Sequence, residues 1–493
     1  HPEISTQSLG QFKLKNITSP IEVFSVTTEG IKVPARSELK GKQEKQIKSI
    51  AVLPFVNRSA NEENEYFSDG MTEEIINALS KIKNLNVTSR TSSFFFKNKN
   101  LPIRQIGQEL NVSTILEGSI RLAGNKMRIT AQLVDVADDF HFWSETFDRS
   151  MNDIFAVQDE ISLLIADKLR EHVGHLEIED RLVEAPKVPV EVYKRYLKSR
   201  YHILKMSKPE IEKGISILED ILAQNPNFPL AHLSIHLSYT LLGTIGLMPA
   251  AEAFAKGQPY LDKAIELNPD LPECQLNLAW ISFLQKWDLE ATYYHLNKVQ
   301  ENRPIVDYYQ SMASTLVAEG KFEAALNYIE TAHQLDPFSH INYHLKGFIF
   351  YVQEKYEKAI DLFEKSVSLK PDAMVSILYQ GQALLLMGQT KEGMAFFQNL
   401  PEDKPADLLK LGGITLAHAA LGEIIQAKAG IAKLEALLQT ELMERAMNLL
   451  ILCHAMLGNQ DKVIDLIEQG IAHRLPMMVY LPTEPALMPL HSI

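Results

Sequence analysis

Two sequence patterns contain residue types used in catalysis, but each lacks a feature that its chemistry requires. Gly118 to Lys126 (GSIRLAGNK) resembles a phosphate-binding loop in composition, yet five residues separate its glycines and no Gly-Lys-Ser/Thr ending follows. His232 and His236 are spaced i, i+4, as in helical zinc sites, but no His-Glu-x-x-His occurs. We interpret the first pattern as a hairpin turn and the second as a polar patch on a helix surface.

A carboxylate cluster precedes an aromatic cluster. Asp135, Asp138 and Asp139 follow a predicted strand, where oxygen ligands attract divalent cations, although we favour the simpler role of keeping a turn in water. Residues 140–143 (FHFW) suit either an aromatic ligand face or a strand core, and we favour the core. The sequence therefore predicts no catalytic, cofactor-binding or metal-binding residue in this chain.

The elements that would carry any binding residue follow a helical repeat from about residue 190 to 493. Prolines end predicted helices at intervals of 35, 33 and 34 residues, and small residues recur 34 apart. These are Pro269, Pro304, Pro337 and Pro371, then Ala313, Gly347 and Gly381, then Ala325 and Ala359. A 34-residue period is the length of the tetratricopeptide (TPR) repeat. We expect about eight repeats, with an insertion around Gly243 to Pro249, forming an all-α TPR superhelix.

Residues 49–175 have a different pattern, typical of an α/β domain with a mixed sheet and helices. SIAVLPF indicates a buried strand, and Ser68, Asp69 and Thr72 are available to cap the amphipathic helix that follows. Further predicted elements are strands at 85–88, 114–120, 126–135 and 141–147, and helices at 103–110 and 154–173. Residues 8–26 predict two strands, and 27–48 a linker whose basic stretch is either solvated or a polyanion or lipid contact.

Part of this domain carries a family resemblance. SIAVLPFVNRSANEENEYFSDGMTEEIINALSKIKNLNVTSRTSS, with IGQELNVSTILEGSIRLAGNKMRITAQLVD and FWSETFDRSMNDIFAVQDEIS, resembles the TolB amino-terminal-like domain that precedes TPR arrays in bacterial adenylate cyclases and related regulators. The resemblance covers about residues 49–165. It implies a cytosolic bacterial signalling protein.

A second resemblance lies ahead of it. LGQFKLKNITSPIEVFSV is similar to the last two strands of a class III nucleotidyl cyclase catalytic domain, with Asn16 at a usual glycine and Phe24 at a usual tyrosine. It implies that residues 1–26 are a remnant of that domain. The metal-binding aspartates, base-recognising residues and transition-state arginine would then lie upstream of His1, so we expect no cyclase active site here. A transcriptional regulator with the same tail is the alternative.

Resemblance to TPR proteins places five polar or aromatic residues on the concave surface that receives peptides, namely Asn277, Gln310, His344, Tyr351 and Gln382. They suit solvated surface equally well. We expect alanine at Asn277, Gln310, His344 or Tyr351 to leave the packing of the repeats largely intact. The expected partners are protein or peptide segments, with the cyclase domain of the same protein as one alternative.

Composition agrees with a protein-binding module. The formal net charge of −13 disfavours non-specific attraction to nucleic acid or an anionic membrane, and no apolar run reaches the roughly 20 residues of a spanning helix. Cys274 and Cys453, the two cysteines, are too few for a disulfide framework and are expected to be buried small hydrophobes in a cytoplasmic protein.

Overall fold

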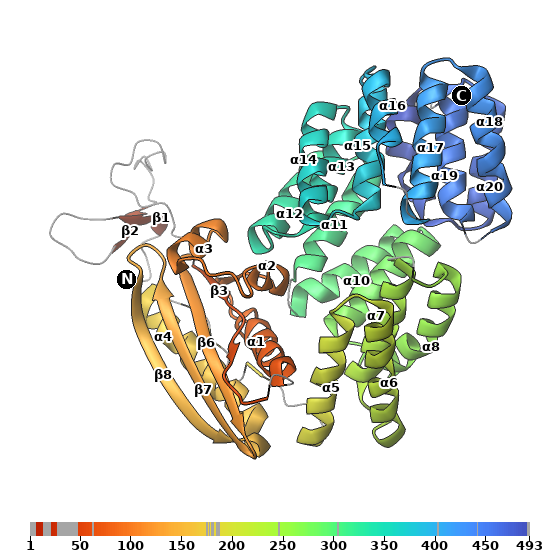
Figure 1. The fold of residues 1–493 in the computed structure, drawn as a ribbon. Helices are drawn as coiled ribbons and strands as arrows, with labels where there is room; N and C mark the ends of the chain where they lie inside the picture. Colours follow the sequence, from red (N-terminus) through yellow and green to blue (C-terminus); the bar gives the residue numbers. More distant parts are fainter. Residues whose placement is uncertain are drawn as a thin grey trace.

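The computed structural model describes residues 6–12, 21–26, 48–61, 64–173, 176, 178, 182–183, 188–244, 247–302, 305–401, 404–440 and 442–490. A mixed sheet with helices comes first, and an array of helices follows (Figure 1). Strands β1 (Thr6–Phe12) and β2 (Ile21–Val26) pair antiparallel ahead of the sheet. The predicted linker over residues 27–48 lies outside the described residues except for Lys48.

The main sheet has the order β5-β3-β6-β7-β8, and β4 (Val56–Asn57) also pairs with β6. The other strands are β3 (Ser49–Val52), β5 (Asn86–Val87), β6 (Thr114–Ala123), β7 (Lys126–Asp135) and β8 (Phe140–Ser150). β3 runs parallel to both neighbours, whereas β6, β7 and β8 form an antiparallel meander. Ala123 pairs with Lys126, so Gly124 and Asn125 form the predicted two-residue turn, and Gly124 has the left-handed φ of +58° that this turn favours.

Helices cover both faces of the central strands. Alternate residues of β3 divide between two apolar clusters: Ile50 and Val52 pack with α1 (Glu65–Leu79) and α4 (Ile154–Val173), and Ala51 packs with α3 (Ile103–Glu109). Strands buried on both faces are expected for the parallel part of a sheet. The prediction that Ser68, Asp69 and Thr72 cap α1 is wrong, because the helix begins earlier, at Glu65, and these three side chains are buried within it.

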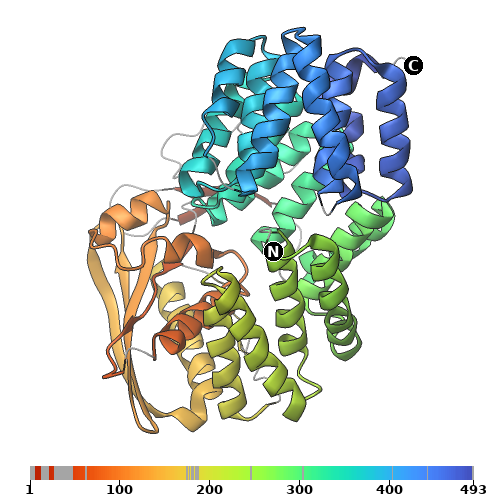
Figure 2. The ribbon, with the colours of Figure 1, turned by 45° about the vertical axis from the view of Figure 1, so that its right-hand side comes forward.

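Eight helix pairs follow the sheet domain within the described residues. They are α5 (Val190–Ile203) with α6 (Lys208–Gln224), α7 (Pro229–Thr244) with α8 (Ala250–Leu267), α9 (Pro272–Ile281) with α10 (Leu289–Asn302), α11 (Val306–Ala318) with α12 (Phe322–Leu335), α13 (His340–Val352) with α14 (Tyr356–Leu369), α15 (Met374–Leu386) with α16 (Thr390–Gln398), α17 (Lys404–Ala420) with α18 (Ile424–Glu435), and α19 (Met443–Met456) with α20 (Gln460–Ala472). The first pairs lie beside the sheet domain and the later pairs form a second lobe (Figures 1 and 2).

Small residues bring paired helices together, as the 34-residue spacing predicts. A methyl group on Gly347 would lie 2.8 Å from the Phe363 ring, and one on Gly381 would lie 2.1 Å from the Phe397 ring. These distances are shorter than van der Waals contact. The phenylalanine of each second helix therefore fills the space that the glycine of the first helix leaves open.

The sheet domain and the first two helix pairs share one apolar core. A single cluster of buried side chains extends from Ile50 and Phe67 through Tyr193 and Leu218 to Leu242. α1 packs against both α4 and α5. The junction between the two parts of the chain is therefore a packed interface.

The chain ends in a C-terminal segment, defined here as residues 475–490, which is not α-helical. It consists of two 3₁₀ helices, η6 (Pro476–Thr483) and η7 (Pro485–Leu490). η6 packs against α11 and against η4 (Ser282–Lys286), a π-helical turn that continues α9. Proline at 476, 482, 485 and 489 removes the N–H groups that an α-helix would need.

Candidate functional site on the inner face of the array

Three of the predicted groove residues join one repeat to the next. Asn277 Oδ1 lies 2.9 Å from His236 Nε2, Gln310 Nε2 donates to Asn342 Oδ1 at 2.7 Å, and His344 Nδ1 lies 3.1 Å from Ser376 Oγ. Each contact connects the first helices of successive pairs. Asn277, Gln310 and His344 thus form a polar ladder that links the repeats, and burial lowers the pKa of His344 to about 4.

Of the other two predicted residues, Tyr351 contacts the C-terminal segment and Gln382 contacts Tyr351. Tyr351 is 0% exposed and its hydroxyl donates to Glu484 Oε1 at 2.8 Å, while Gln382 Oε1 lies 3.4 Å from the same hydroxyl. Gln382 is also buried. The expectation that alanine at Tyr351 leaves the packing intact is wrong, because this ring also packs against Phe348 and Tyr379.

Tyr480 occupies an aromatic pocket in the middle of the array. Its ring makes edge contacts with Phe283 of η4 and Phe348 of α13, at centroid distances of 5.8 and 5.5 Å. Its hydroxyl bonds the buried Ser314 side chain of α11. An aromatic ring whose polar end also has a partner is the kind of residue that anchors protein contacts.

Glu484 is a buried acidic residue of the segment and is 8% exposed. Its carboxylate accepts from Tyr351 and from the Ala486 N–H at 3.3 Å. Burial raises the pKa of Glu484. The two hydrogen bonds act in the opposite direction but do not cancel this effect. The titratable groups that act on it in the described structure are tyrosines, namely Tyr351 on α13, Tyr356 on α14 and Tyr379 on α15. Among the described residues, no cationic side chain is a partner of the buried Glu484 carboxyl group.

Arg474 fixes the start of the segment to the third helix pair. Its Nη1 lies 3.4 Å from the carbonyl oxygens of Gln285 and Lys286, and its guanidinium lies 5.4 Å from the centre of the Trp287 ring. Trp287 has a left-handed φ of +56° and ends the π-helical turn. The distorted end of α9 thus presents both Phe283 and the carbonyl groups of Gln285 and Lys286 to the C-terminal part of the chain.

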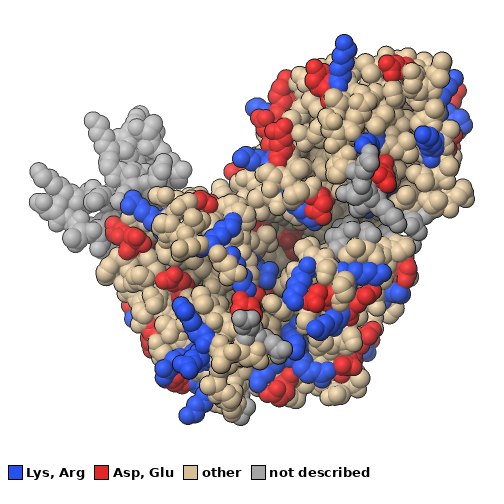
Figure 3. Space-filling model, viewed as in Figure 1, with Lys and Arg blue, Asp and Glu red and all other residues tan. Residues whose placement is uncertain are grey.

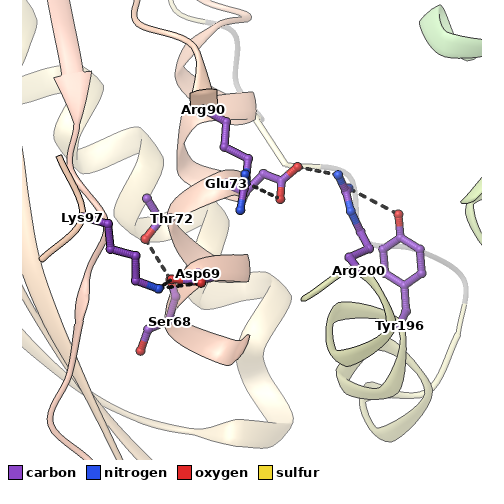
Figure 4. Close-up of polar contacts among 8 residues, drawn as sticks. All are labelled: Ser68, Asp69, Thr72, Glu73, Arg90, Lys97, Tyr196 and Arg200. Atoms are coloured by element: carbon purple, nitrogen blue, oxygen red, sulfur yellow. Dashed lines mark hydrogen bonds and ion pairs between the residues drawn. The ribbon is translucent and has the colours of Figure 1, made fainter. Parts of the chain in front are cut away.

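A second polar site joins the sheet domain to the array (Figure 4). Glu73 of α1 lies between Arg90, at 3.4 Å, and Arg200 of α5, at 2.5 Å, and Arg200 also approaches the Tyr196 hydroxyl at 3.5 Å. The carboxylate of Glu73 raises the pKa of Arg200. One turn earlier, Asp69 accepts from Lys97 Nζ at 2.6 Å. Glu73 therefore connects the two parts of the chain through a partly buried ion pair.

The repeat-ending turn before α13 docks on α2 (Arg90–Phe94) of the sheet domain. Ser92 Oγ donates to Asp336 Oδ1 and accepts from the Phe338 N–H, and the Ser89 N–H donates to the Leu335 carbonyl at 2.8 Å. The Phe338 ring stacks on Phe95 at 4.1 Å. Burial raises the pKa of Asp336, against the opposing effect of the serine hydroxyl groups. The sheet domain is thus attached at two separate places in the array.

The other residues that the sequence suggested for chemistry make contacts that stabilise the fold. Gly118 to Lys126 is part of the β6–β7 hairpin, as predicted. His236 is buried, so its assignment to a surface patch is wrong. Asp135 accepts from the turn amides of Ala137 and Asp138 and pairs with His172 at 2.9 Å. The described residues contain no group of three His, Cys, Asp or Glu side chains placed to hold a metal ion.

Both cysteines are unpaired and buried, as predicted, and burial raises the pKa of Cys274 to about 12. On the face drawn in Figure 3, acidic and basic side chains are interspersed over both lobes. Among the helices that the structure describes, none combines the length and the apolar character needed to cross a membrane.

Sequence reasoning missed the partners of the groove, chiefly Phe283, Ser314, Tyr480 and Glu484. One signal was present: VYLPTEPALMPL is apolar and rich in proline, and it follows the last helical repeat. An apolar stretch that cannot form an α-helix must be covered by something. The sequence does not reveal which helices cover it, because its contacts with α11 and η4 join residues far apart in the chain.

Comparisons with known proteins identify parts of this architecture. The tetratricopeptide repeat family matches residues 306–339 and 342–373, so the chain contains TPR repeats. The family described as HilA/YgeH-like transcriptional regulator, second domain, matches residues 45–164. This region coincides closely with the one that resembles the TolB amino-terminal-like domain.

One curated relative, "Putative adenylate cyclase 3" of Rhizobium meliloti (strain 1021), is 37% identical over 235 residues. The match covers 46% of this chain and 39% of that protein, so the chain spans well under half of the relative.

Solved structures similar to the chain include the human IFIT1 dimer with PPP-AAAA, at 18% identity and a TM-score of 0.40, covering 64% of this chain and 78% of that one. YrrB, described as a TPR protein with an unusual peptide-binding site, is 21% identical with a TM-score of 0.23, covering 38% and 96%. Scores this low carry no argument about function.

Proposed function

We propose that this chain is the protein-binding and regulatory part of a signalling protein, and that it forms the non-catalytic tail of an adenylate cyclase. The observation that supports protein binding is the packing of the C-terminal segment on the array, whose middle repeats contact this segment through Tyr480 and Glu484. A surface that holds one segment through an aromatic anchor and a hydrogen-bonded carboxylate has the chemistry to hold another.

The cyclase assignment is supported by the relative named as a putative adenylate cyclase and by the resemblance of residues 9–26 to the end of a cyclase catalytic domain. In this proposal the chain carries no catalytic residue and acts by binding. The docking of the sheet domain at two places in the array would let a change in the groove reach the rest of the protein, because both contacts are packed and hydrogen-bonded.

Peptide display on the immobilised full chain tests protein binding. Peptides selected by the wild type should bind the Gln382→Ala variant at least about fivefold more weakly, since the groove loses a polar group. Tyr294→Ala serves as the control, because Tyr294 is an exposed residue of α10. Selected peptides that bind all three proteins equally would show that the groove is not the binding surface.

Regulation is tested on the Rhizobium relative. Its rate of cyclic AMP formation should change by at least about threefold when the region matching this chain is removed, and an unchanged rate would contradict a regulatory role. The HilA/YgeH-like match supports a second candidate, the tail of a transcriptional regulator. For that candidate, the native protein would bind a specific DNA sequence and form no cyclic AMP.

A further inference from the structure

The C-terminal segment reaches across the array. Leu475, Met478 and Leu487 belong to the apolar cluster of the last helix pairs, whereas Tyr480 packs on the cluster of the middle pairs. In a helical repeat array, each repeat needs contact only with its neighbours. Covering the last repeat explains the contacts of Leu475, Met478 and Leu487. It does not explain why Tyr480 and Glu484, within residues 480–484, contact the middle helix pairs.

This stretch, which we name the plug (residues 480–484, YLPTE), presents two anchors four residues apart. Tyr480 fills the pocket of Phe283, Phe348 and Ser314. Glu484 reaches the Tyr351 hydroxyl. Between them, Pro482 is exposed, Thr483 is buried, and Leu481 packs against the apolar cluster of the last helix pairs.

The second anchor, Glu484, is buried with only part of its lost hydration replaced. A buried carboxylate loses its hydration, and here a tyrosine hydroxyl and one amide N–H replace the water. Without a paired cation these bonds only partly offset the loss. The plug is therefore held firmly at Tyr480 and less firmly at Glu484, which suits a contact that can be exchanged.

We propose that the groove between η4, α11, α13 and α15 recognises protein segments in which an aromatic residue is followed four residues later by a carboxylate, and that the plug is an internal competitor for this site. The proposal rests on the protein-binding function proposed above and specifies its ligand. A partner segment binds when it displaces residues 480–484, while Leu475 and Leu487 keep both ends of the plug attached to the last helix pairs.

The test uses the full chain and a fluorescent synthetic peptide of residues 475–490, followed by fluorescence anisotropy. The Tyr480→Ala/Glu484→Ala chain should bind this peptide with a Kd at least tenfold lower than the wild-type chain, whose own plug competes. Met488→Ala is the matched control, since Met488 is an exposed residue of the same segment, and it should behave as wild type. A peptide carrying alanine in place of Tyr480 and Glu484 should bind neither chain.

Adding Tyr351→Phe to the double variant should weaken binding of the peptide about fivefold, because one hydrogen bond is lost.

Two results of this binding experiment would overturn the proposal. If the double variant melts cooperatively but does not bind the peptide, the plug is a permanent part of the fold. If all chains bind it equally, its site lies elsewhere, and protein binding itself would still stand on the display experiment.

A second measurement uses the wild-type chain and therefore does not depend on the folding of the double variant. Excess isotope-labelled peptide should speed hydrogen exchange of the amides at residues 480–486 in the wild-type chain, and unchanged exchange would refute displacement. A wild-type dimer that the peptide dissociates would show that the occupant comes from a second copy, which also overturns an internal competitor.

Discussion

Replacing Phe338 with alanine should loosen the docking of the sheet domain on the array while leaving both parts folded. The Phe338 ring stacks on Phe95 and makes an edge contact with Phe96 at 5.3 Å. Each ring pair contributes about 0.5–1.5 kcal/mol, and the rest of this partly buried ring contributes about 1 kcal/mol more. We therefore expect the interface to weaken by about 2–4 kcal/mol.

Hydrogen exchange measured by mass spectrometry reads this interface directly, because the Ser89 N–H bonds across it to Leu335. A weakening of about 2–4 kcal/mol should speed exchange of the amides of residues 89–97 by about 30- to 900-fold, provided that they exchange through local opening. Ile341→Ala, at an exposed position of the adjoining helix, is the control and should change little. Unchanged exchange at residues 89–97 in Phe338→Ala would refute the claim that this ring holds the domain.

Three further outcomes are expected. Gly381→Ala should destabilise the array by about 1–3 kcal/mol in thermal or denaturant unfolding, because the new methyl group would overlap the Phe397 ring; an unchanged melt would show that the helices separate freely. Since burial raises the pKa of Glu484, docking of the plug should be most stable below about pH 4.5, the ordinary pKa of a glutamate, and weaken as the pH rises toward the raised value. Glu484→Gln should remove this dependence from the exchange of the Ala486 amide, and an equal pH dependence in both proteins would assign it to another group. Finally, the purified chain should form no cyclic nucleotide from ATP or GTP with magnesium or manganese, and reproducible turnover above a blank would contradict the absence of a cyclase site.

The array was predictable because its signal is periodic and local. Proline and glycine recur every 34 residues because each repeat ends its helices and packs its helix pair in the same way. Gly347 and Gly381 allow the paired helices to approach closely, as predicted. The strands and the Gly124-Asn125 turn were predictable for the same reason. Ser68, Asp69 and Thr72 misled because a side chain able to cap a helix is equally able to bond within one, as Thr72 does to the Ser68 carbonyl.

The site was harder to predict because its partners are distant in sequence. Tyr351 and Glu484 are 133 residues apart, and Ser92 and Asp336 are 244 apart. A repeat register places Tyr351 on the inner face of the array but gives no information on what covers it. Nor does it distinguish a residue that faces a ligand from one, such as His344, that bonds the next repeat.

The apolar core shared by the sheet domain and the first two helix pairs bears on how such proteins are assembled in evolution. The match to the HilA/YgeH-like second domain ends at residue 164, yet the cluster that begins with Ile50 continues to Leu242. A gene fusion that joined a sheet domain to a foreign array at residue 175 would leave the α5-facing side of α1 without its partners Tyr193 and Leu197. The sheet domain and its first repeats should therefore be inherited together, while repeats are gained or lost further along the array.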